Sequence, residues 1–180
     1  MTTTALQTWL RTRAESDRHA AFEAIVSAWG AAIRRTCRGF ERAEARQDEL
    51  VQEVLMNIWR ALPGLVSPES ARSWVLRIAH NTALKHVRHH APRRRMESEV
   101  DVESVVHGLQ EVVVDRARKR ARLHAAIQQL PPADRSLVLL WLEGLDHHEL
   151  ADVSGLSPTN VRTRLSRLRA RLTRALGGTP

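Results

Sequence analysis

The sequence is poor in the residues that build disulfide frameworks and membrane spans. Its 180 residues include one cysteine, Cys37, and no tyrosine. A lone cysteine excludes an internal disulfide framework and fits a reducing compartment. The longest apolar run, residues 137–142, is far shorter than the ~20 residues that a membrane-spanning helix needs. The start of the chain, MTTTALQTWLRTRAESDRHA, lacks the apolar segment of a secretory signal peptide. These absences predict a cytoplasmic protein.

Acidic residues are the minority among the charged ones. The chain has 28 Lys and Arg against 20 Asp and Glu, which gives a formal net charge of +8. Such a balance indicates a nucleic-acid partner first and an anionic membrane surface second, although a soluble basic protein with neither partner is the alternative. The 43% hydrophobic content is enough for compact cores and argues against a disordered tail.

Strand-like alternation of useful length is also missing, and glycine and proline cluster between segments of helical period. The fold class predicted is therefore all-α, with two small helical domains joined by a flexible linker. We expect a polar, frayed N-terminal tail over residues 1–18, a first domain over 19–92, a linker over 93–112 and a second domain over 113–178. The linker contains MESEVDVE, an acidic run within an otherwise basic chain.

The first domain should contain three helices, over about residues 19–40, 48–62 and 68–90. The second of these, DELVQEVLMNIWRAL, has a wide apolar face. Its other face carries Asp48, Glu49, Gln52 and Glu53, which form either a partner site or an ordinary solvated surface. Ser67, Pro68 and Glu69 supply a cap, a proline and an acid, which favour a helix start there.

The second domain should end in a helix-turn-helix. A helix over residues 132–143 stops at Gly144, and Asp146 with Glu149 forms a capping box for a short helix over 147–154. Gly155 suits the positive φ of a tight turn. Ser157 and Pro158 then start the closing helix, SPTNVRTRLSRLRARLTRAL.

The closing helix carries its positive charge around one apolar stripe. Val161, Leu165, Leu168, Leu172 and Leu176 recur at helical spacing. Since the N-terminal part of the second helix of such a motif meets base edges, Thr163 and Arg167, with Arg162 leaning in, should read bases. The remaining arginines should hold phosphates: Arg164, Arg169, Arg171 and Arg174. The alternative is a solvated arginine face on an ordinary helix.

In this order, DELVQEVLMNIWRAL, SARSWVLRIAHNTALKHVRHH and LPPADRSLVLLWLEGLDHHELADVSGLSPTNVRTRLSRLRARL resemble an extracytoplasmic-function (ECF) sigma factor of bacterial RNA polymerase. The resemblance spans residues 19–176. It implies sigma regions two and four, joined by a flexible linker. His147-His148 and Ser154 depart from the family pattern, where a Ser-Tyr-like pair and a larger apolar residue are usual.

The resemblance also implies residue roles. Asp48, Glu49, Gln52 and Glu53 lie on the helix that docks on the β′ clamp of the polymerase. The helix facing the minus-ten element carries Trp74, Arg77, Asn81 and Lys85, although plain core packing remains open for Trp74. The loop over residues 64–69 corresponds to one that captures a flipped non-template base. Arg162, Thr163 and Arg167 match the minus-thirty-five reading positions.

Enzyme readings find no support in the sequence. The cluster of His86, His89 and His90 lacks ligand companions at metal-binding spacing, and no phosphate loop, nucleophile elbow or catalytic carboxylate pair is recognisable. We expect no enzymatic activity, no cofactor, no metal and no small-molecule substrate. The runner-up function is a stand-alone helix-turn-helix regulator, and a third is a pure interaction protein.

The partners implied by the resemblance are core RNA polymerase, through its β′ clamp and β flap, promoter DNA, and an anti-sigma factor. The expected location is the bacterial cytoplasm, associated with the nucleoid, with the anti-sigma factor able to hold the protein at the membrane.

Overall fold

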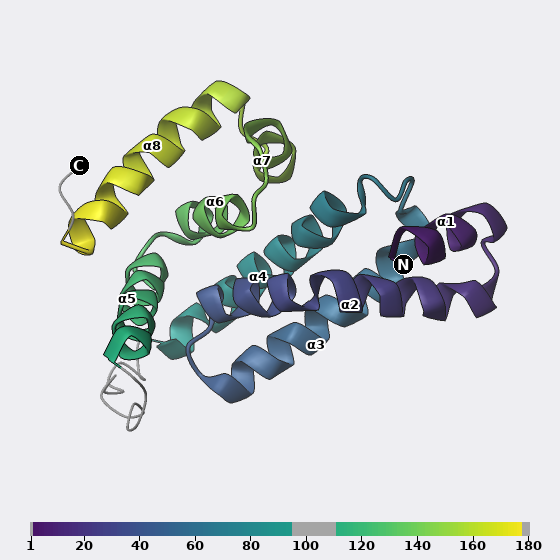
Figure 1. Cartoon of the computed structure of the whole chain (residues 1–180), viewed down its shortest axis with the longest axis horizontal. Helices are drawn as coiled ribbons and strands as arrows, with labels where there is room; N and C mark the ends of the chain where they lie inside the picture. Colours follow the sequence, from purple (N-terminus) through teal and green to yellow (C-terminus); the bar gives the residue numbers. More distant parts are fainter. Residues whose placement is uncertain (1, 95–110, 178–180) are drawn as a thin grey trace.

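The computed structural model describes residues 2–94 and 111–177, and every regular element within them is a helix. Figure 1 shows their order along the chain. The predicted all-α class is therefore confirmed, and most of the expected linker lies outside the described residues. The elements are α1 (Thr2–Thr12), α2 (Glu15–Phe40), α3 (Glu44–Ala61), the 3-10 turn η1 (Leu62–Gly64), α4 (Ala71–Arg94), α5 (Glu111–Gln128), α6 (Pro132–Leu142), α7 (His147–Ser154) and α8 (Pro158–Ala175).

The first body consists of α2, α3 and α4, with α1 packed on α2 (Figure 1). Apolar side chains at helical spacing meet in its core, including Ile25, Ile33, Leu50, Val54 and Ile58, none of which is exposed. Helix α2 begins four residues earlier than the sequence pattern indicated, and α3 also begins four residues earlier. Both extensions add polar residues ahead of the apolar face, which the periodicity alone could not place.

The prediction of a frayed N-terminal tail over residues 1–18 was wrong. Residues 2–12 form α1 instead of a frayed segment, and Leu6 and Trp9 are only 1% and 2% exposed. Two large side chains three residues apart share one helical face, so burying that face against α2 stabilises a helix too short to form alone. Leu10 adds to this face as a half-buried side chain, and the exposed residues of α1 are polar.

The second body contains α5 to α8, and its last two helices form the predicted helix-turn-helix. Asp146 caps α7, accepting from the His148 and Glu149 amides, while the Glu149 carboxylate accepts from the Asp146 amide at 2.9 Å. Gly155 follows α7 with φ of 71°, a conformation that costs glycine little. The predicted capping box and turn glycine are confirmed.

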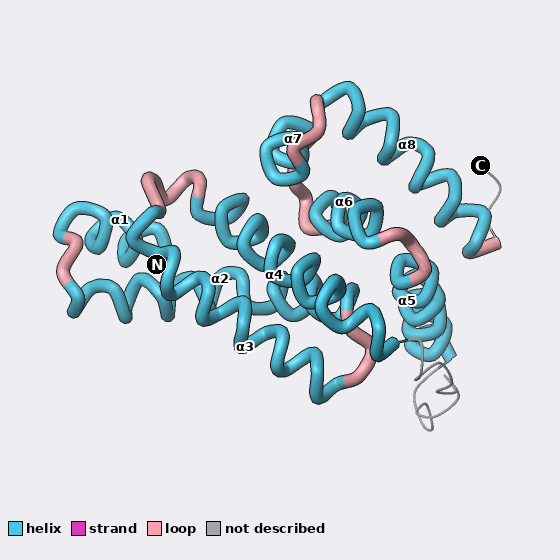
Figure 2. The backbone as a smooth tube through the Cα atoms, turned by 180° about the vertical axis from the view of Figure 1, so that it is seen from behind, coloured by secondary structure: helices cyan, strands magenta, loops and turns pink. Residues whose placement is uncertain are grey.

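The two bodies pack against each other through α6, which lies between α8 on one side and α2 and α4 on the other (Figures 1 and 2). Across this contact, the Ser136 hydroxyl is hydrogen bonded to Nδ1 of His80, and both side chains are buried. Leu139 lies directly against the backbone of Gly39. Sequence patterns gave no sign of this contact.

Candidate nucleic-acid and protein interfaces

Helix α8 is built to present one face of the second body to solvent. The Ser157 side chain caps it by accepting from the Asn160 amide at 3.3 Å, and Pro158 occupies the first helical position. The buried stripe consists of four of the five predicted residues, Val161, Leu165, Leu168 and Leu172, whereas Leu176 caps the end of the helix and is half-buried. Packing of this stripe on α6 and α7 fixes which side chains point outward.

The arginines of α8 fall into two groups. Arg162, Arg167 and Arg171 are exposed, and so is Thr163, whose hydroxyl donates to the Thr159 carbonyl at 3.0 Å. Two others turn back onto the protein. Arg164 Nε lies 2.5 Å from Asp134 Oδ1, and the Arg169 guanidinium lies 5.2 Å from the centre of the Trp141 ring. Arg174 is exposed, with Nε donating to Ala170 of its own helix.

Helix α7 supports α8 through a well-satisfied turn. The Asp146 carboxyl keeps a pKa below its usual value because it accepts from the Glu149 amide, so it stays ionised at the positive end of α7. At the other end, Ser154 Oγ donates to the Leu150 carbonyl at 2.6 Å. The serine found where the family pattern favours an apolar residue thus makes a hydrogen bond within its own helix.

A polar face runs along α4 on the first body. Arg77, Asn81 and Lys85 are exposed and lie on one side of the helix, at spacings of four residues. Trp74 continues that side by one turn, but it is half-buried and packs against the core. The buried His80 and Thr82 flank this face, one on each side, and Ala79 and Ala83 lie opposite it in the core.

The acidic face of α3 is open to solvent. Asp48, Glu49 and Gln52 are exposed and Glu53 is half-buried. Gln52 also borders an apolar groove of about 500 Å³ between α2 and α3. The groove is lined by Phe22, Gln52, Leu55, Met56, Trp59 and Arg60, and Met56 is 51% exposed. An acidic rim beside an apolar groove is complementary to a protein partner with basic and apolar side chains.

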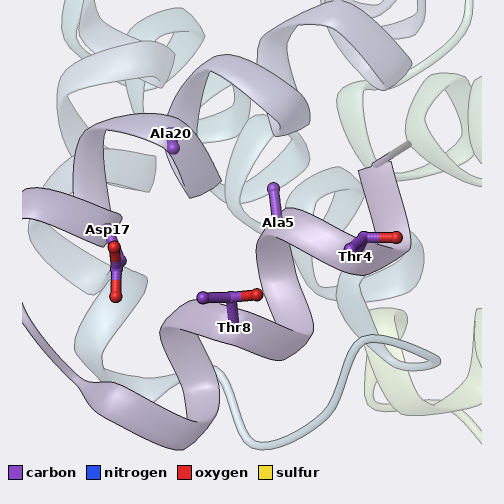
Figure 3. Close-up of a pocket in the computed structure, with 5 residues that line it drawn as sticks. All are labelled: Thr4, Ala5, Thr8, Asp17 and Ala20. Carbon is purple, nitrogen blue, oxygen red and sulfur yellow. The ribbon is translucent and has the colours of Figure 1, made fainter.

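Another hollow lies between α1 and α2 and has a volume of about 420 Å³ (Figure 3). Its lining consists of small side chains and one carboxylate, Asp17, which accepts a hydrogen bond from the Thr12 hydroxyl at 2.6 Å. Asp17 is the one titratable side chain of this lining, and the other four residues are Thr4, Ala5, Thr8 and Ala20. The hollow therefore offers no acid–base pair for chemistry.

The histidine cluster of the sequence does not come together as a metal site in the described part of the chain. His86 is buried and its Nε2 lies 3.3 Å from the Glu41 carboxylate, while His89 is exposed. The His90 side chain lies outside the described residues. No group of three metal-ligating side chains occurs within the described ranges. Nor does any helix there have the length and apolar character needed to cross a bilayer.

Several residues that join distant parts of the structure were not predicted from the sequence. Arg13 and Arg18 hold backbone carbonyls at the end of α3 and in the loop after it. Arg35 of α2 pairs with Glu143 at the end of α6. These side chains have no local pattern, because each partner lies more than 40 residues away.

The geometry defines a two-domain helical protein with a helix-turn-helix in its second domain and two further polar faces in its first. Comparison with known families agrees. The family Sigma-70 region 2 matches residues 25–93, and Sigma-70, region 4 matches residues 116–172.

Individual relatives extend this similarity. The chain is 33% identical over 145 residues to the RNA polymerase sigma-H factor of Pseudomonas aeruginosa, covering 74% of each. It is 29% identical over 172 residues to the sigma factor NccH of Alcaligenes xylosoxydans xylosoxydans, covering 92% of this chain and 91% of NccH. The structure of CnrH in complex with the cytosolic domain of CnrY has the same fold, with a TM-score of 0.67, 23% identity and 98% coverage of both chains.

The chain therefore belongs to the sigma-70 family of RNA polymerase sigma factors, and to its ECF type. Sigma factors are non-catalytic subunits that bind core RNA polymerase and direct it to promoter DNA. The alternative of a stand-alone regulator is not favoured, because both sigma regions are present.

Proposed function

We propose that the chain works as a bipartite promoter reader, with three faces in separate roles. Asp48, Glu49, Gln52 and Glu53 dock core polymerase. Trp74, Arg77, Asn81 and Lys85 face the minus-ten element. Arg162, Thr163 and Arg167 read the minus-thirty-five element. On this assignment sigma region two covers residues 19–92 and sigma region four covers residues 113–178, and the chain contributes no catalysis of its own.

The observation that carries the minus-thirty-five assignment is the separation of arginines on α8. Arg162 and Arg167 point to solvent from the first three turns, where such a helix meets base edges. An arginine that is free to present its planar fork can pair with both acceptors of a guanine. Arg171 and Arg174 lie further along the helix and suit phosphates. Arg164 and Arg169, which contact Asp134 and Trp141, join them only if those contacts yield to DNA.

The minus-ten assignment rests on the polar face of α4 and the loop before it. Arg77 and Lys85 supply charge for a backbone, and Asn81 between them supplies a hydrogen-bonding amide. Trp74 offers part of a ring surface while its other part packs on the core. An unpaired strand needs cationic anchoring and a surface for stacking, which this face provides.

The docking assignment rests on charge and shape. An exposed carboxylate row on α3 lies beside an apolar groove, so a basic partner helix could pair with the row and bury apolar side chains in the groove. The clamp of the β′ subunit is the partner we assign to it. We further propose contact of the second body with the β flap.

An anti-sigma factor is the regulator we propose. Among solved structures with the same fold, RpoE is in complex with the anti-sigma factor NepR from Bartonella quintana, and CnrH is in complex with the cytosolic domain of CnrY. The protein would act in the bacterial cytoplasm at the nucleoid, and its anti-sigma factor would withhold it there or at the membrane.

The test is run-off transcription with purified core polymerase on a genomic promoter pool. We expect transcripts that need both core and this chain, and that start at a common set of sites. Glu49→Lys with Glu53→Lys should abolish core-dependent transcription, whereas the matched variant Glu44→Lys, at the start of the same helix, should not. Binding of duplex DNA by the free chain with no core-dependent transcript would contradict the proposal.

A further inference from the structure

The N-terminal segment holds the loop that joins α3 to α4. The Arg13 guanidinium donates from Nη1 to the Pro63 carbonyl at 3.2 Å and from Nη2 to the Leu65 carbonyl at 3.1 Å. Figures 1 and 2 show α1 at the same end of the molecule as this loop. One side chain thus bridges two carbonyls on either side of Gly64, fifty residues away in sequence.

Contacts with its own N-terminal segment hold Arg13 in place beside the loop. It lies between α1 and α2 with φ of 53°, the one non-glycine residue with positive φ in the described part of the chain. Its amide donates to the Trp9 carbonyl at 2.7 Å, and its guanidinium lies 4.5 Å from the centre of the Trp9 ring. Since Trp9 is 2% exposed, the surface under the guanidinium is part of the core.

Arg18 makes a similar contact to the end of α3, just before this loop. Its Nη2 donates to the Trp59 carbonyl at 2.9 Å, in the last turn of α3, and its guanidinium lies 4.2 Å from the centre of the Trp59 ring. A cation at this end of a helix bonds a carbonyl that has no partner within the helix and offsets the negative end of the helix dipole. Together the two arginines tie the N-terminal segment to residues 59–65.

The loop that they hold has a fixed base and an open tip. Leu62 and Leu65 are fully buried, and the Ser70 amide donates to Ser67 Oγ at 3.3 Å just before α4. Val66, by contrast, is 84% exposed, and open space lies around the Cα of Gly64. Val66 is thus an apolar side chain held out from a braced loop, five residues before α4 begins, and it can contact the face of an unpaired base.

We propose that Arg13 is a positioning residue for the capture of an unpaired promoter base, and that it acts by holding the Pro63 and Leu65 carbonyls. This inference rests on the proposed minus-ten role of the first body. Arg13 touches no DNA itself. It keeps the loop in one conformation before the base binds, so binding does not have to include the entropy cost of ordering the loop.

The experiment uses holoenzyme assembled from core and full-length chain. One probe is a promoter fork whose non-template minus-ten strand is unpaired, and the second is a duplex that carries only the minus-thirty-five element. Arg13→Gln removes the charged donor at the same chain length, and Arg13→Lys keeps the charge. Arg11→Gln is the matched control, because Arg11 is exposed on the same short helix.

We expect Arg13→Gln to weaken binding of the fork by about threefold to tenfold, as for the net loss of one ordinary hydrogen bond, and Arg13→Lys to restore part of it. Affinity for core and for the duplex probe should match that of Arg11→Gln. Equal fork affinities for Arg13→Gln and Arg11→Gln would overturn the inference. So would a loss of the same size for fork, duplex and core, since that marks a general defect of folding. If the wild-type holoenzyme gives no core-dependent transcript, the proposed function fails instead.

Discussion

Arg35 of α2 and Glu143 at the end of α6 form a two-pronged ion pair across the two bodies. The Nε atom lies 2.6 Å from Oε1 and Nη2 lies 2.7 Å from Oε2. The hydrogen bond to Glu143 raises the pKa of Arg35. Arg72 of α4 donates to the backbone carbonyl of the same Glu143. A single residue after α6 therefore joins the second body to two helices of the first.

This pair predicts a measurable but small coupling between the bodies. The Arg35 side chain is 57% exposed, so solvent screens the attraction, while Glu143 is 12% exposed. A double-mutant cycle with Arg35→Ala and Glu143→Ala should give a coupling free energy of about 1 kcal/mol or less, decreasing with salt. The measurement is the separation of the two bodies in increasing urea. It is monitored by energy transfer between two dyes, attached to cysteines that replace the exposed Ser27 and Ser166. Strictly additive effects of the two substitutions would contradict the coupling.

Gly39 permits the closest backbone approach between the bodies. A Cβ added there would lie 2.9 Å from Leu139 Cδ2, with Cδ1 closer still, so Leu139 would have to move. Gly39→Ala should therefore separate the bodies, although alanine normally favours a helix over glycine by about 1 kcal/mol. Energy transfer between the two dyes should fall, while the helical circular dichroism of the chain stays the same.

The control for this prediction is Leu139→Ala in the same chain. Truncating Leu139 removes the obstruction, so Gly39→Ala combined with Leu139→Ala should recover part of the energy transfer that Gly39→Ala loses. A Gly39→Ala variant that keeps the wild-type transfer would mean that Leu139 has room to rotate, and that the contact tolerates a methyl group.

His80 makes the stability of the fold sensitive to acid. Burial lowers the pKa of His80 from 6.5 to about 4, and the neutral ring is hydrogen bonded to Ser136. Because the unfolded chain takes up a proton below pH 6.5 and the folded chain does so only near pH 4, stability should fall between these values as the pH falls. One such group contributes a loss of about 2 kcal/mol at pH 5 relative to pH 8.

The measurement is chemical unfolding at several pH values between 4 and 8. His80→Asn keeps a hydrogen-bonding group for Ser136 but cannot titrate, so its stability should depend less on pH. The dependence will not vanish, because burial and the nearby Arg38, Arg135 and Arg42 also lower the pKa of His124. Identical slopes for wild type and His80→Asn would exclude His80 as a source.

Local patterns were enough to predict the helix-turn-helix. The capping box of Asp146 and Glu149, the turn at Gly155 and the stripe from Val161 to Leu172 each depend on residues within one or two turns. The family resemblance added the order of the two domains. The packing of the bodies was not predictable in this way, because Arg35 and Glu143 lie 108 residues apart and neither belongs to a periodic pattern.

For the candidate site, the sequence predicted which side of α8 each arginine lies on, but not which of them contact other parts of the protein. Helical geometry put Arg167 on the outward side of α8 and Arg162 on a flank from which it leans in, and the structure leaves both exposed. The same geometry put Arg164 on a flank free for phosphate, but Asp134, thirty residues earlier, pairs with it. The N-terminal helix was missed because its buried face contains only a few apolar residues, and its burial depends on a complementary surface of α2.

Arg167 and Arg171 should differ in what they contribute to DNA binding. If Arg167 reads a base, Arg167→Ala lowers discrimination at one promoter position by about 1–3 kcal/mol. If Arg171 holds a phosphate, Arg171→Ala weakens all sequences alike and lowers the slope of log affinity against log salt by about 1. The measurement is holoenzyme binding to a minus-thirty-five library at three salt concentrations. Equal, sequence-independent losses for both variants would contradict a reading role for Arg167.

Arg164 provides the sharpest contrast on the same helix, because its partner is protein. Arg164 Nε lies 2.5 Å from Asp134 Oδ1, and the side chains are 42% and 16% exposed. Arg164→Ala should lower the free energy of unfolding by up to about 1 kcal/mol and leave the salt slope of DNA binding nearly unchanged. Asp134→Asn should lower stability by less and should raise DNA affinity, since it removes a negative charge and releases Arg164 for a phosphate. A reduced salt slope in Arg164→Ala would show instead that DNA displaces Asp134 and that Arg164 belongs with the phosphate-holding arginines.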